Sequence, residues 1–391
     1  MKFNKMVFFI TEDCNFNCSY CRQKKEKKVM RLSTIESAVP FFYPFLEEQT
    51  TVIFYGGEPL LAFDVLQHAV SLFLELEKTG KKRLKFSLTT NGSLLTDEIL
   101  DFFNRHRFYL LLSFDGGGQD MNRKPGSLEI TKEIIARFRG NAYPDIEFAT
   151  NSVFTPGTVG GLAESLRMIV ESDVRDIQFS LDTTVPWDET ALSALERQME
   201  QLRDFLVSHY KKTKTIPLSY FQKPDGTLKP QPKNNVFTCA GGNDRITISP
   251  DEDVWACLHF HTYLMDKHGS DEYKTYSLGK LEDFKKNHET IFPRWLENSG
   301  DLRQDFFFTE NRFCFLCEEV EQCSICPLYA AYATSCIGKI PSWMCHTQRI
   351  PRKAKEHFLK IIEGIDSRQI ELEPKNDSTG GNHESFKISK R

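Results

Sequence analysis

The sequence predicts an α/β fold built on a parallel sheet, followed by a small cysteine-rich domain with little regular structure. Short apolar runs alternate with segments of helical periodicity through roughly the first 180 residues, and each run ends in glycine or small polar residues. This alternation stops in the second half, where eight of the 11 cysteines gather between positions 239 and 345. A chain of 391 residues is long enough for one large domain and a smaller one.

The apolar runs define six expected strands. They are Met6–Ile10, Thr51–Tyr55, Leu84–Thr89, Phe108–Phe114, Ile146–Val153 and Asp176–Leu181. Helices are expected over Val29–Leu46 (interrupted by Pro40 and Pro44), Phe63–Glu77, Asp97–Arg105, Thr131–Phe138 and Leu162–Glu171. Ligands of such sheets bind at the carboxyl ends of the strands, so the polar turns there mark the expected site.

The domain boundaries follow from composition. We expect a core over 1–190, a helix and a Pro-rich linker over 191–235, the cysteine-rich domain over 236–365, and a disordered polar tail over 366–391. No signal peptide and no run of about 18 apolar residues is evident, which favours a soluble, cytoplasmic protein without a membrane partner. The net charge of -4 and pI near 6.2 argue against nucleic-acid binding.

The cysteine loop after the first strand contains Cys14, Cys18 and Cys21 in a C-x3-C-x2-C spacing. Three thiols on one loop can hold three corners of an iron–sulfur cube and leave one iron open for chemistry. Two other interpretations remain. A structural zinc site would need a fourth ligand, and His68 is the first histidine after Cys21. A disulfide would leave one thiol over and suits a secreted protein.

A second motif, Gly56-Gly57-Glu58-Pro59, follows the second strand, and its glycines let the backbone approach a ligand closely. With both motifs, roughly residues 5 to 190 resemble the radical S-adenosylmethionine (SAM) superfamily. The resemblance implies a partial (β/α)6 TIM-like barrel, with Cys14, Cys18 and Cys21 as ligands of a [4Fe-4S] cluster. One electron from that cluster would break the sulfonium bond of SAM and give a 5'-deoxyadenosyl radical.

The resemblance also implies SAM contacts, residue by residue. Gly57 and Glu58 match the motif that meets the methionine ammonium, and Arg123 matches an arginine that pairs with the cofactor carboxylate. Polar groups at strand ends would face the ribose, and aromatic groups of the cysteine loop would line the cluster and the adenine. The full set of candidates is Phe16, Tyr20, Gly56, Gly57, Glu58, Asn91, Ser113, Asp115, Arg123 and Asn151. No residue is assigned a catalytic acid–base role.

The eight later cysteines form two complete ligand sets, either for two cubane clusters or for two zinc ions, and spacing alone does not decide. Their order resembles the SPASM extension of peptide-modifying radical enzymes, which binds two auxiliary [4Fe-4S] clusters and would bring the total to three. The resemblance assigns Cys239, Cys257 and Cys326, with Cys336 as the candidate fourth ligand, to auxiliary cluster I. It assigns Cys314, Cys317, Cys323 and Cys345 to auxiliary cluster II.

This chain departs from the SPASM pattern in two places. It has no cysteine between Cys239 and Cys257, and the C-x3-C ending is replaced by Cys323-x2-Cys326 and a longer gap to Cys336. The fourth ligand of auxiliary cluster I therefore stays open, and an open iron there could bind a substrate thiolate. The histidines beside these cysteines, His259, His261 and His346, remain alternative ligands.

The SPASM resemblance implies a maturase that oxidatively modifies a ribosomally made peptide by a thioether or another intramolecular crosslink. The alternatives are an anaerobic sulfatase-maturing enzyme, which generates formylglycine, a peptide epimerase, and a non-catalytic zinc-stabilised binding protein. Sulfatase-maturing enzymes usually carry an aromatic pair after the third cysteine, where this chain has Arg22-Gln23.

The maturase interpretation implies particular partners. They are the precursor peptide and an electron donor such as flavodoxin or ferredoxin. The first strand begins almost at the N-terminus and leaves no room for a leader-binding module before it, so a separate leader-binding protein is a further candidate partner.

Overall fold

The centre of the fold is a nine-stranded sheet in the order β6-β5-β4-β3-β2-β1-β7-β8-β9. The computed structural model describes residues 1–139, 142–223, 241–299, 312–320, 323 and 325–372. The first six strands are β1 (Phe3–Thr11), β2 (Leu46–Gly56), β3 (Arg83–Thr90), β4 (Tyr109–Ser113), β5 (Glu147–Phe154) and β6 (Ile177–Leu181). Each pairs in parallel with the next, which confirms the expected parallel sheet.

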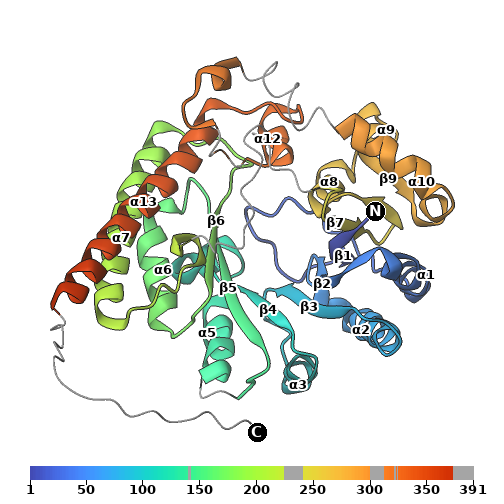
Figure 1. The fold of residues 1–391 in the computed structure, drawn as a ribbon, viewed down its shortest axis with the longest axis horizontal. Helices are drawn as coiled ribbons and strands as arrows, with labels where there is room; N and C mark the ends of the chain where they lie inside the picture. The colour runs from blue at the N-terminus through green and yellow to red at the C-terminus, as the bar shows by residue number, and fades with distance from the viewer. Residues whose placement is uncertain (140–141, 224–240, 300–311, 321–322, 324, 373–391) are drawn as a thin grey trace, which may run out of the picture.

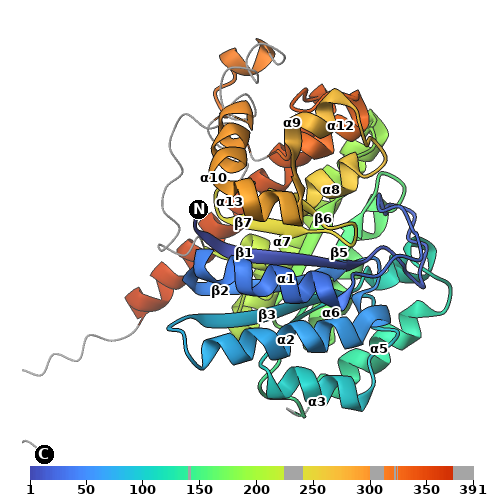
Figure 2. The same cartoon turned by 90° about the vertical axis from the view of Figure 1, so that its right-hand side faces the viewer.

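Helices follow the strands and cover the outer face of the curved sheet (Figure 1). The crossover helices are α1 (Leu32–Phe42), α2 (Phe63–Glu77), α3 (Asp97–Arg105), α5 (Ser127–Phe138) and α6 (Leu162–Glu171). Short helical turns lie between them: η1 (Tyr43–Phe45), η2 (Pro59–Ala62), η3 (Gly116–Gly118), α4 (Gln119–Asn122) and η5 (Val159–Gly161). Figure 2 shows α1, α2 and α3 running side by side along the sheet.

The alternation of side chains along the strands separates the core from the site. Phe8 and Phe54 stack on the outer face with ring centroids 6.2 Å apart, and Phe73 of α2 packs on Phe8. Their sequence neighbours Phe9 and Tyr55 point to the opposite, inner face, where their rings lie 5.8 Å apart. The outer face is thus a phenylalanine-rich core, and the inner face is left for the functional site.

Helix α7 (Glu189–Thr213) occupies the first part of the segment 191–235, where a helix and a linker were expected, and η6 (Ser219–Phe221) follows it. The α7 helix starts where the Asp188 side chain accepts a hydrogen bond from the backbone N–H of Ala191 at 2.8 Å. Residues 224–240, which include most of the predicted linker, lie outside the described residues.

The expectation of little regular structure between 236 and 365 is wrong. Strand β7 (Arg245–Ile248) pairs in parallel with β1, and β8 (Asp253–Trp255) and β9 (Ser277–Lys280) continue the sheet in antiparallel fashion. The helical elements are α8 (Leu258–Leu264), α9 (Asp271–Tyr276), α10 (Leu281–Asn298), η8 (Arg312–Leu316), α12 (Pro327–Thr334) and α13 (Ser342–Leu372). The cysteine-rich region therefore extends the barrel sheet.

Helix α13 lies along α7 (Figure 1) and overruns the predicted start of the tail. The Tyr210 hydroxyl of α7 donates to Asp366 at 2.8 Å, and Lys214 pairs with the same carboxylate at 3.1 Å. These contacts hold residues just beyond 365 in the helix, so disorder from 366 onward is corrected to helix as far as Leu372. Residues 373–391 lie outside the described part of the chain.

One described segment, Pro59–Glu77, is long and apolar enough to span a bilayer by composition. This segment contains the crossover helix α2, whose Val65, Leu66 and Phe73 side chains are buried in the core. A buried crossover helix meets the same criterion of length and composition, so the segment is weak evidence for a membrane span.

Candidate active site

The cysteine loop leaves the end of β1 and brings its three thiols together. Cys14 interacts electrostatically with Cys18, and Cys18 with Cys21. The Phe16 N–H donates to the Cys14 sulfur at 3.4 Å, and the Cys21 N–H donates to the Cys18 carbonyl at 3.1 Å. Burial raises the pKa of the Cys14 thiol to about 11 and also raises that of Cys18. Such thiols become thiolates readily only when a bound metal stabilises the charge, so the trio fits an iron–sulfur cluster.

The Gly56-Gly57-Glu58 turn lies directly against the start of the cysteine loop. The Gly57 N–H donates to the Thr11 carbonyl and the Glu58 N–H to the Asp13 carbonyl, both at 2.8 Å. A Cβ on Gly57 would lie 2.1 Å from the Asp13 oxygen, and one on Gly56, whose φ is +147°, 2.2 Å from the Thr11 oxygen. The glycines were predicted to allow close approach of a ligand. The close approach that the structure shows is to the backbone of the cysteine loop.

The Glu58 carboxylate is fully buried and joins the ends of two strands. It accepts hydrogen bonds from the Leu60 N–H at 3.1 Å, the Thr90 hydroxyl at 2.8 Å and the Asn91 N–H at 2.8 Å. Burial raises the pKa of Glu58 to about 7, and the three donors act in the opposite direction. The Asn91 amide in turn donates to the Asn15 side chain at 2.9 Å. Glu58 and Asn91 therefore brace the cysteine loop as well as lying where SAM contacts were predicted.

Asp115, which was predicted to face the ribose, is surrounded by hydrogen-bond donors of the protein itself. Its side chain is 0% exposed. Its carboxylate accepts from Arg123 Nε and Nη2 at 3.0 and 2.9 Å and from the Val153 N–H at 2.9 Å. The Tyr20 hydroxyl and the Asn122 amide also donate to it, each at 3.2 Å. Because its carboxylate already accepts hydrogen bonds from five donors of the protein, Asp115 is a structural anchor.

Arg123, which was predicted to pair with the cofactor carboxylate, already has a carboxylate partner within the protein. Its guanidinium is paired with Asp115 and lies 5.3 Å from the centre of the Tyr20 ring. Tyr20 belongs to the cysteine loop, so the pair fastens that loop to the end of β4. Phe16, the other predicted aromatic contact, is buried at 3% exposure with Lys124 over its ring at 5.3 Å.

A cavity of about 250 Å³ opens at the carboxyl ends of the strands. It is lined by three parts of the chain: the cysteine loop, the ends of β2, β5 and β6, and the cysteine-rich region. The lining includes Tyr20, Cys21, Arg22, Gln23, Tyr55, Asn151, Val153, Ser180, Asp182, Thr184, Leu258, His259, Thr262, Tyr329 and Tyr332. Of the predicted SAM contacts, Tyr20 and Asn151 face this cavity, whereas Ser113 is not among its lining residues.

Several lining residues were not predicted as site residues. Arg22 Nε donates to the Thr184 hydroxyl at 2.7 Å, and its Nη2 lies 3.8 Å from an Asp182 oxygen. This link joins the cysteine loop to the end of β6 across the cavity. Burial lowers the pKa of His259 to about 4, so this imidazole is neutral at pH 7. The sequence signals were the adjacency of Arg22 to Cys21 and the polar turn after the sixth strand.

The four thiols predicted as the auxiliary cluster II set meet in one cavity of about 500 Å³. They are Cys314, Cys317, Cys323 and Cys345. Burial raises the pKa of the Cys314 thiol to about 12, and the neighbouring Cys345, Cys323 and Cys317 act in the same direction. Four sulfurs around one cavity match the ligand number of a cubane cluster or of a zinc ion. His346 also lines this cavity.

The predicted auxiliary cluster I set is only partly described. Cys257 and Cys326 both interact electrostatically with the Tyr329 phenol, which lines the 250 Å³ cavity. Cys239 lies outside the described residues. Cys336 lies where the chain reverses after α12, and Gly338 N–H reaches the Pro327 carbonyl at 3.3 Å.

His261, another candidate ligand, lies against Glu12 and Phe9. Its Nε2 lies 3.5 Å from a Glu12 oxygen, and its ring lies 4.6 Å from that of Phe9. Both His261 and Glu12 are 1% exposed. The pair therefore joins α8 to the chain just before Cys14.

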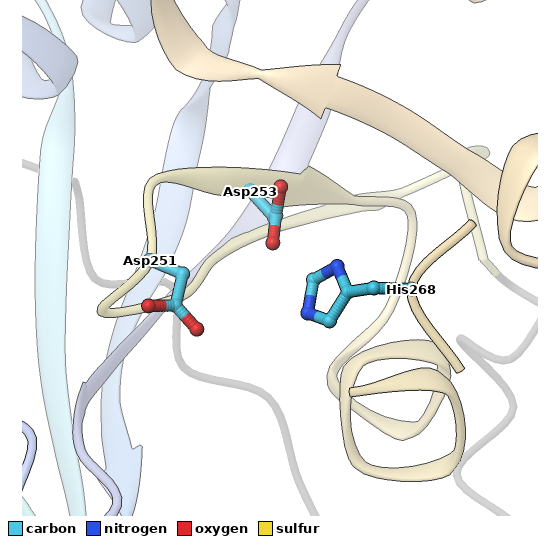
Figure 3. Close-up of side chains that lie close together, drawn as sticks. All are labelled: Asp251, Asp253 and His268. Carbon is cyan, nitrogen blue, oxygen red and sulfur yellow. The ribbon is translucent and has the colours of Figure 1, made fainter. Parts of the chain in front are cut away.

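Asp251, Asp253 and His268 also place potential metal-ligating atoms within 4.8 Å of one another (Figure 3). Both carboxylates already have cationic partners, Lys28 at 2.8 Å from Asp251 and Lys280 at 2.9 Å from Asp253. The Lys28–Asp251 pair ties the segment after the cysteine loop to the β7–β8 turn, and the Lys280–Asp253 pair ties β9 to β8.

Comparisons with known proteins agree with this geometry. Residues 8–172 match the family model described as the Radical SAM superfamily. A cysteine-type anaerobic sulfatase-maturating enzyme from Clostridium perfringens is 26% identical over 308 residues, which cover 71% of this chain and 79% of the relative.

Solved structures share the fold. One, anSMEcpe with bound AdoMet and Cp18Cys peptide, has a TM-score of 0.67 at 17% identity and covers 92% of this chain and 99% of that one. Streptococcus suis SuiB bound to S-adenosylmethionine has a TM-score of 0.56 at 13% identity, with coverage of 82% and 72%. Radical SAM enzymes bind a [4Fe-4S] cluster and SAM, which the Cys14, Cys18 and Cys21 trio suits. The chain carries a radical SAM domain over residues 8–172 and is a radical SAM enzyme.

Proposed function

We propose that this radical SAM enzyme oxidises a cysteine or serine side chain of a peptide or protein to formylglycine, as a sulfatase-type maturase. The proposal rests on the cavity that is lined by Cys21 of the cysteine loop and by Tyr329. Tyr329 in turn interacts with Cys257 and Cys326. A substrate side chain in this cavity would lie between the radical-generating site and a second set of thiols. The likeness to a sulfatase-maturating enzyme, which extends over 79% of that relative, supports this reaction over a crosslink.

The protein's own residues would prepare the cavity for the reaction. When bound, SAM and the reduced cluster supply the radical that removes a hydrogen atom from the substrate. Glu58 and the Asp115–Arg123 pair hold the cysteine loop in place, through Asn91 and Tyr20 respectively. Tyr55, Tyr329 and Tyr332 shield the reacting carbon from water, and Arg22 and Thr184 offer polar contacts to a peptide backbone.

The cysteine-rich region would hold two auxiliary [4Fe-4S] clusters, one on Cys314, Cys317, Cys323 and Cys345. The other would use Cys257 and Cys326 together with Cys239 and Cys336. Formylglycine formation from cysteine releases sulfide, takes its oxygen from water and leaves one electron on the substrate radical to be removed, which an auxiliary cluster can accept. Three clusters predict a brown protein with about twelve irons per chain, whereas zinc sites predict a colourless region.

An intramolecular thioether or another crosslink of a ribosomally made peptide is the second candidate. It is favoured by Arg22 and Gln23, which occupy the position of the usual aromatic pair of sulfatase maturases and line the cavity. Either reaction calls for a cytoplasmic setting and an electron donor such as flavodoxin or ferredoxin. The crosslinking reaction also admits a separate leader-binding protein.

The test is anaerobic reconstitution with SAM and dithionite, followed by incubation with two substrates. One is a peptide from a sulfatase active site that contains its cysteine. The other is the peptide encoded by a small cysteine-containing open reading frame at the same locus as this enzyme. Tandem mass spectrometry distinguishes an aldehyde in place of the thiol from a loss of two hydrogens, which indicates a crosslink. Deuterium uptake from heavy water without mass loss would indicate epimerisation and overturn both oxidative reactions.

The control is Cys18→Ala. It should abolish 5'-deoxyadenosine formation while about eight irons remain on the auxiliary sites. If SAM cleavage persisted in this variant, the cysteine loop would not be the radical-generating site.

A further inference from the structure

Arg349 lines the four-thiol cavity, although the sequence motifs do not include it. It follows Cys345 by four residues on α13, so the two side chains share one face of the helix. Its Nη2 donates a hydrogen bond to the Cys317 sulfur at 3.3 Å. The guanidinium also interacts electrostatically with Cys314, Cys323 and Cys345. Arg349 therefore contacts one sulfur and acts electrostatically on the other three, and Arg352, which also lines the cavity, acts on Cys323.

The guanidinium is held in this orientation from its other side. Glu319 accepts an ion-paired contact from Arg349 Nε at 3.0 Å. The same carboxylate is bound by Arg352, which therefore helps to fix Glu319. With Nε directed at Glu319 and Nη2 at Cys317, Arg349 cannot turn away without losing one of these contacts.

We propose that Arg349 is a positioning residue of the auxiliary cluster II site, where it fixes Cys317 and favours the one-electron reduced state of the site. A cubane with four thiolates carries a net charge of about −2 when oxidised and about −3 when reduced by one electron. A fixed cation that donates an N–H···S hydrogen bond stabilises the more negative state. The inference rests on the proposed iron–sulfur character of this site and is independent of which peptide reaction the enzyme performs.

The size of the effect is limited by solvent. The Arg349 side chain is 38% exposed and that of Glu319 35%, so water and salt screen the charge. We therefore expect removal of the cation to lower the ratio of reduced to oxidised site by about tenfold at a fixed solution potential, which is ~59 mV for one electron.

The experiment is an anaerobic redox titration of the reconstituted full chain, followed by electron paramagnetic resonance. Cys14, Cys18 and Cys21 are replaced by alanine in every sample, so that only the auxiliary sites contribute signals. Arg349→Gln removes the cation, and Arg349→Lys keeps the charge without the fork of N–H donors. The matched control is Lys353→Gln, which removes one positive charge from an exposed position of the same helix.

The expected result is a lower midpoint potential for one auxiliary signal in Arg349→Gln, a smaller shift in Arg349→Lys and none in Lys353→Gln. Selective loss of about four irons in Arg349→Gln would also support the role, because it would show that the site needs Arg349 to assemble. Full iron content with unchanged potentials in Arg349→Gln would overturn the proposal. So would a four-thiol site that binds zinc in the unsubstituted chain, an outcome that leaves the peptide reaction untouched.

Discussion

Replacing Asp115 by asparagine tests whether this residue anchors the cysteine loop or contacts the ribose of SAM. The substitution keeps the shape of the side chain but removes its charge. Arg123, whose side chain is 6% exposed, would then face a neutral amide while remaining buried. Removing one partner of a buried ion pair typically costs about 3–5 kcal/mol, because the remaining charge is left uncompensated. The new amide nitrogen is itself a hydrogen-bond donor, and it would lie against other donors such as the Val153 N–H or Arg123.

The assay is urea unfolding of the cluster-free chain, with SAM binding to the reconstituted protein measured separately. Asp115→Asn should lower the free energy of unfolding by about 3–5 kcal/mol. Asp115→Asn combined with Arg123→Gln should cost less than the sum of the two single changes, because both remove the same pair. The matched control is Glu171→Gln, which breaks the exposed Arg167–Glu171 pair and should cost less than about 1 kcal/mol.

The opposite pattern would refute this reasoning. If Asp115→Asn unfolds at the urea concentration of the unsubstituted chain and only weakens SAM binding, then Asp115 acts on the ribose and the ion pair contributes little. Additive costs for Asp115→Asn and Arg123→Gln would likewise show that the two side chains do not act as a unit.

Two further predictions concern the turn beside the cysteine loop and the cavity. Gly57→Ala would place a Cβ 2.1 Å from the Asp13 carbonyl oxygen, so the turn and the loop must separate. We expect loss of about four irons, measured by iron analysis, with the auxiliary iron retained; unchanged iron content and SAM cleavage would contradict the close contact. His259 has a folded-state pKa lowered to about 4 by burial, against about 6.5 when unfolded, so the folded state binds fewer protons between these values. The stability of the cluster-free chain should therefore fall as pH drops from 6.5 towards 4, by up to about 3 kcal/mol. The loss should be smaller in His259→Gln by urea unfolding at each pH, and equal slopes for the two proteins would show that His259 is not the cause.

The strands were predictable because their apolar runs end in distinct turns, but the boundary between the first helix and the second strand was wrong for a physical reason. The expected helix through Leu46 stops at Phe42, and β2 begins at Leu46 rather than at Thr51. Glu47, Glu48 and Gln49 are exposed in the strand. Pairing with β1 jumps from Leu46, opposite Phe3, to Thr51, opposite Lys5, so this polar stretch is an irregularity within the strand. Its last residue, Gln49, pairs with Arg83 of β3. A pattern that relies on apolar side chains does not detect it.

The site was predictable in its location but not in its pairings. The motifs identified Asp115 as a residue at a strand end, which is correct, and singled out Arg123 in the segment that follows. Which polar group each would meet depends on η3 and α4, the short turns that carry Arg123 back onto Asp115. The Arg22–Thr184 link likewise joins residues 162 positions apart and leaves no local signal. Sequence spacing therefore located the candidate site, whereas the structure determined which residues support it and which line it.

The sheet itself explains how a radical site and a cysteine-rich region can share one cavity. Strand β1, which leads into the cysteine loop, pairs with β7, the first strand of the cysteine-rich region. The α8 helix begins directly after Cys257 and places His261 against Glu12, two residues before Cys14. Hydrogen-bonded strands and buried side-chain contacts resist relative movement more than a flexible linker would. The separation between the Cys14–Cys21 loop and Cys257 is thus set by the fold, and a substrate must fit the space that remains between them.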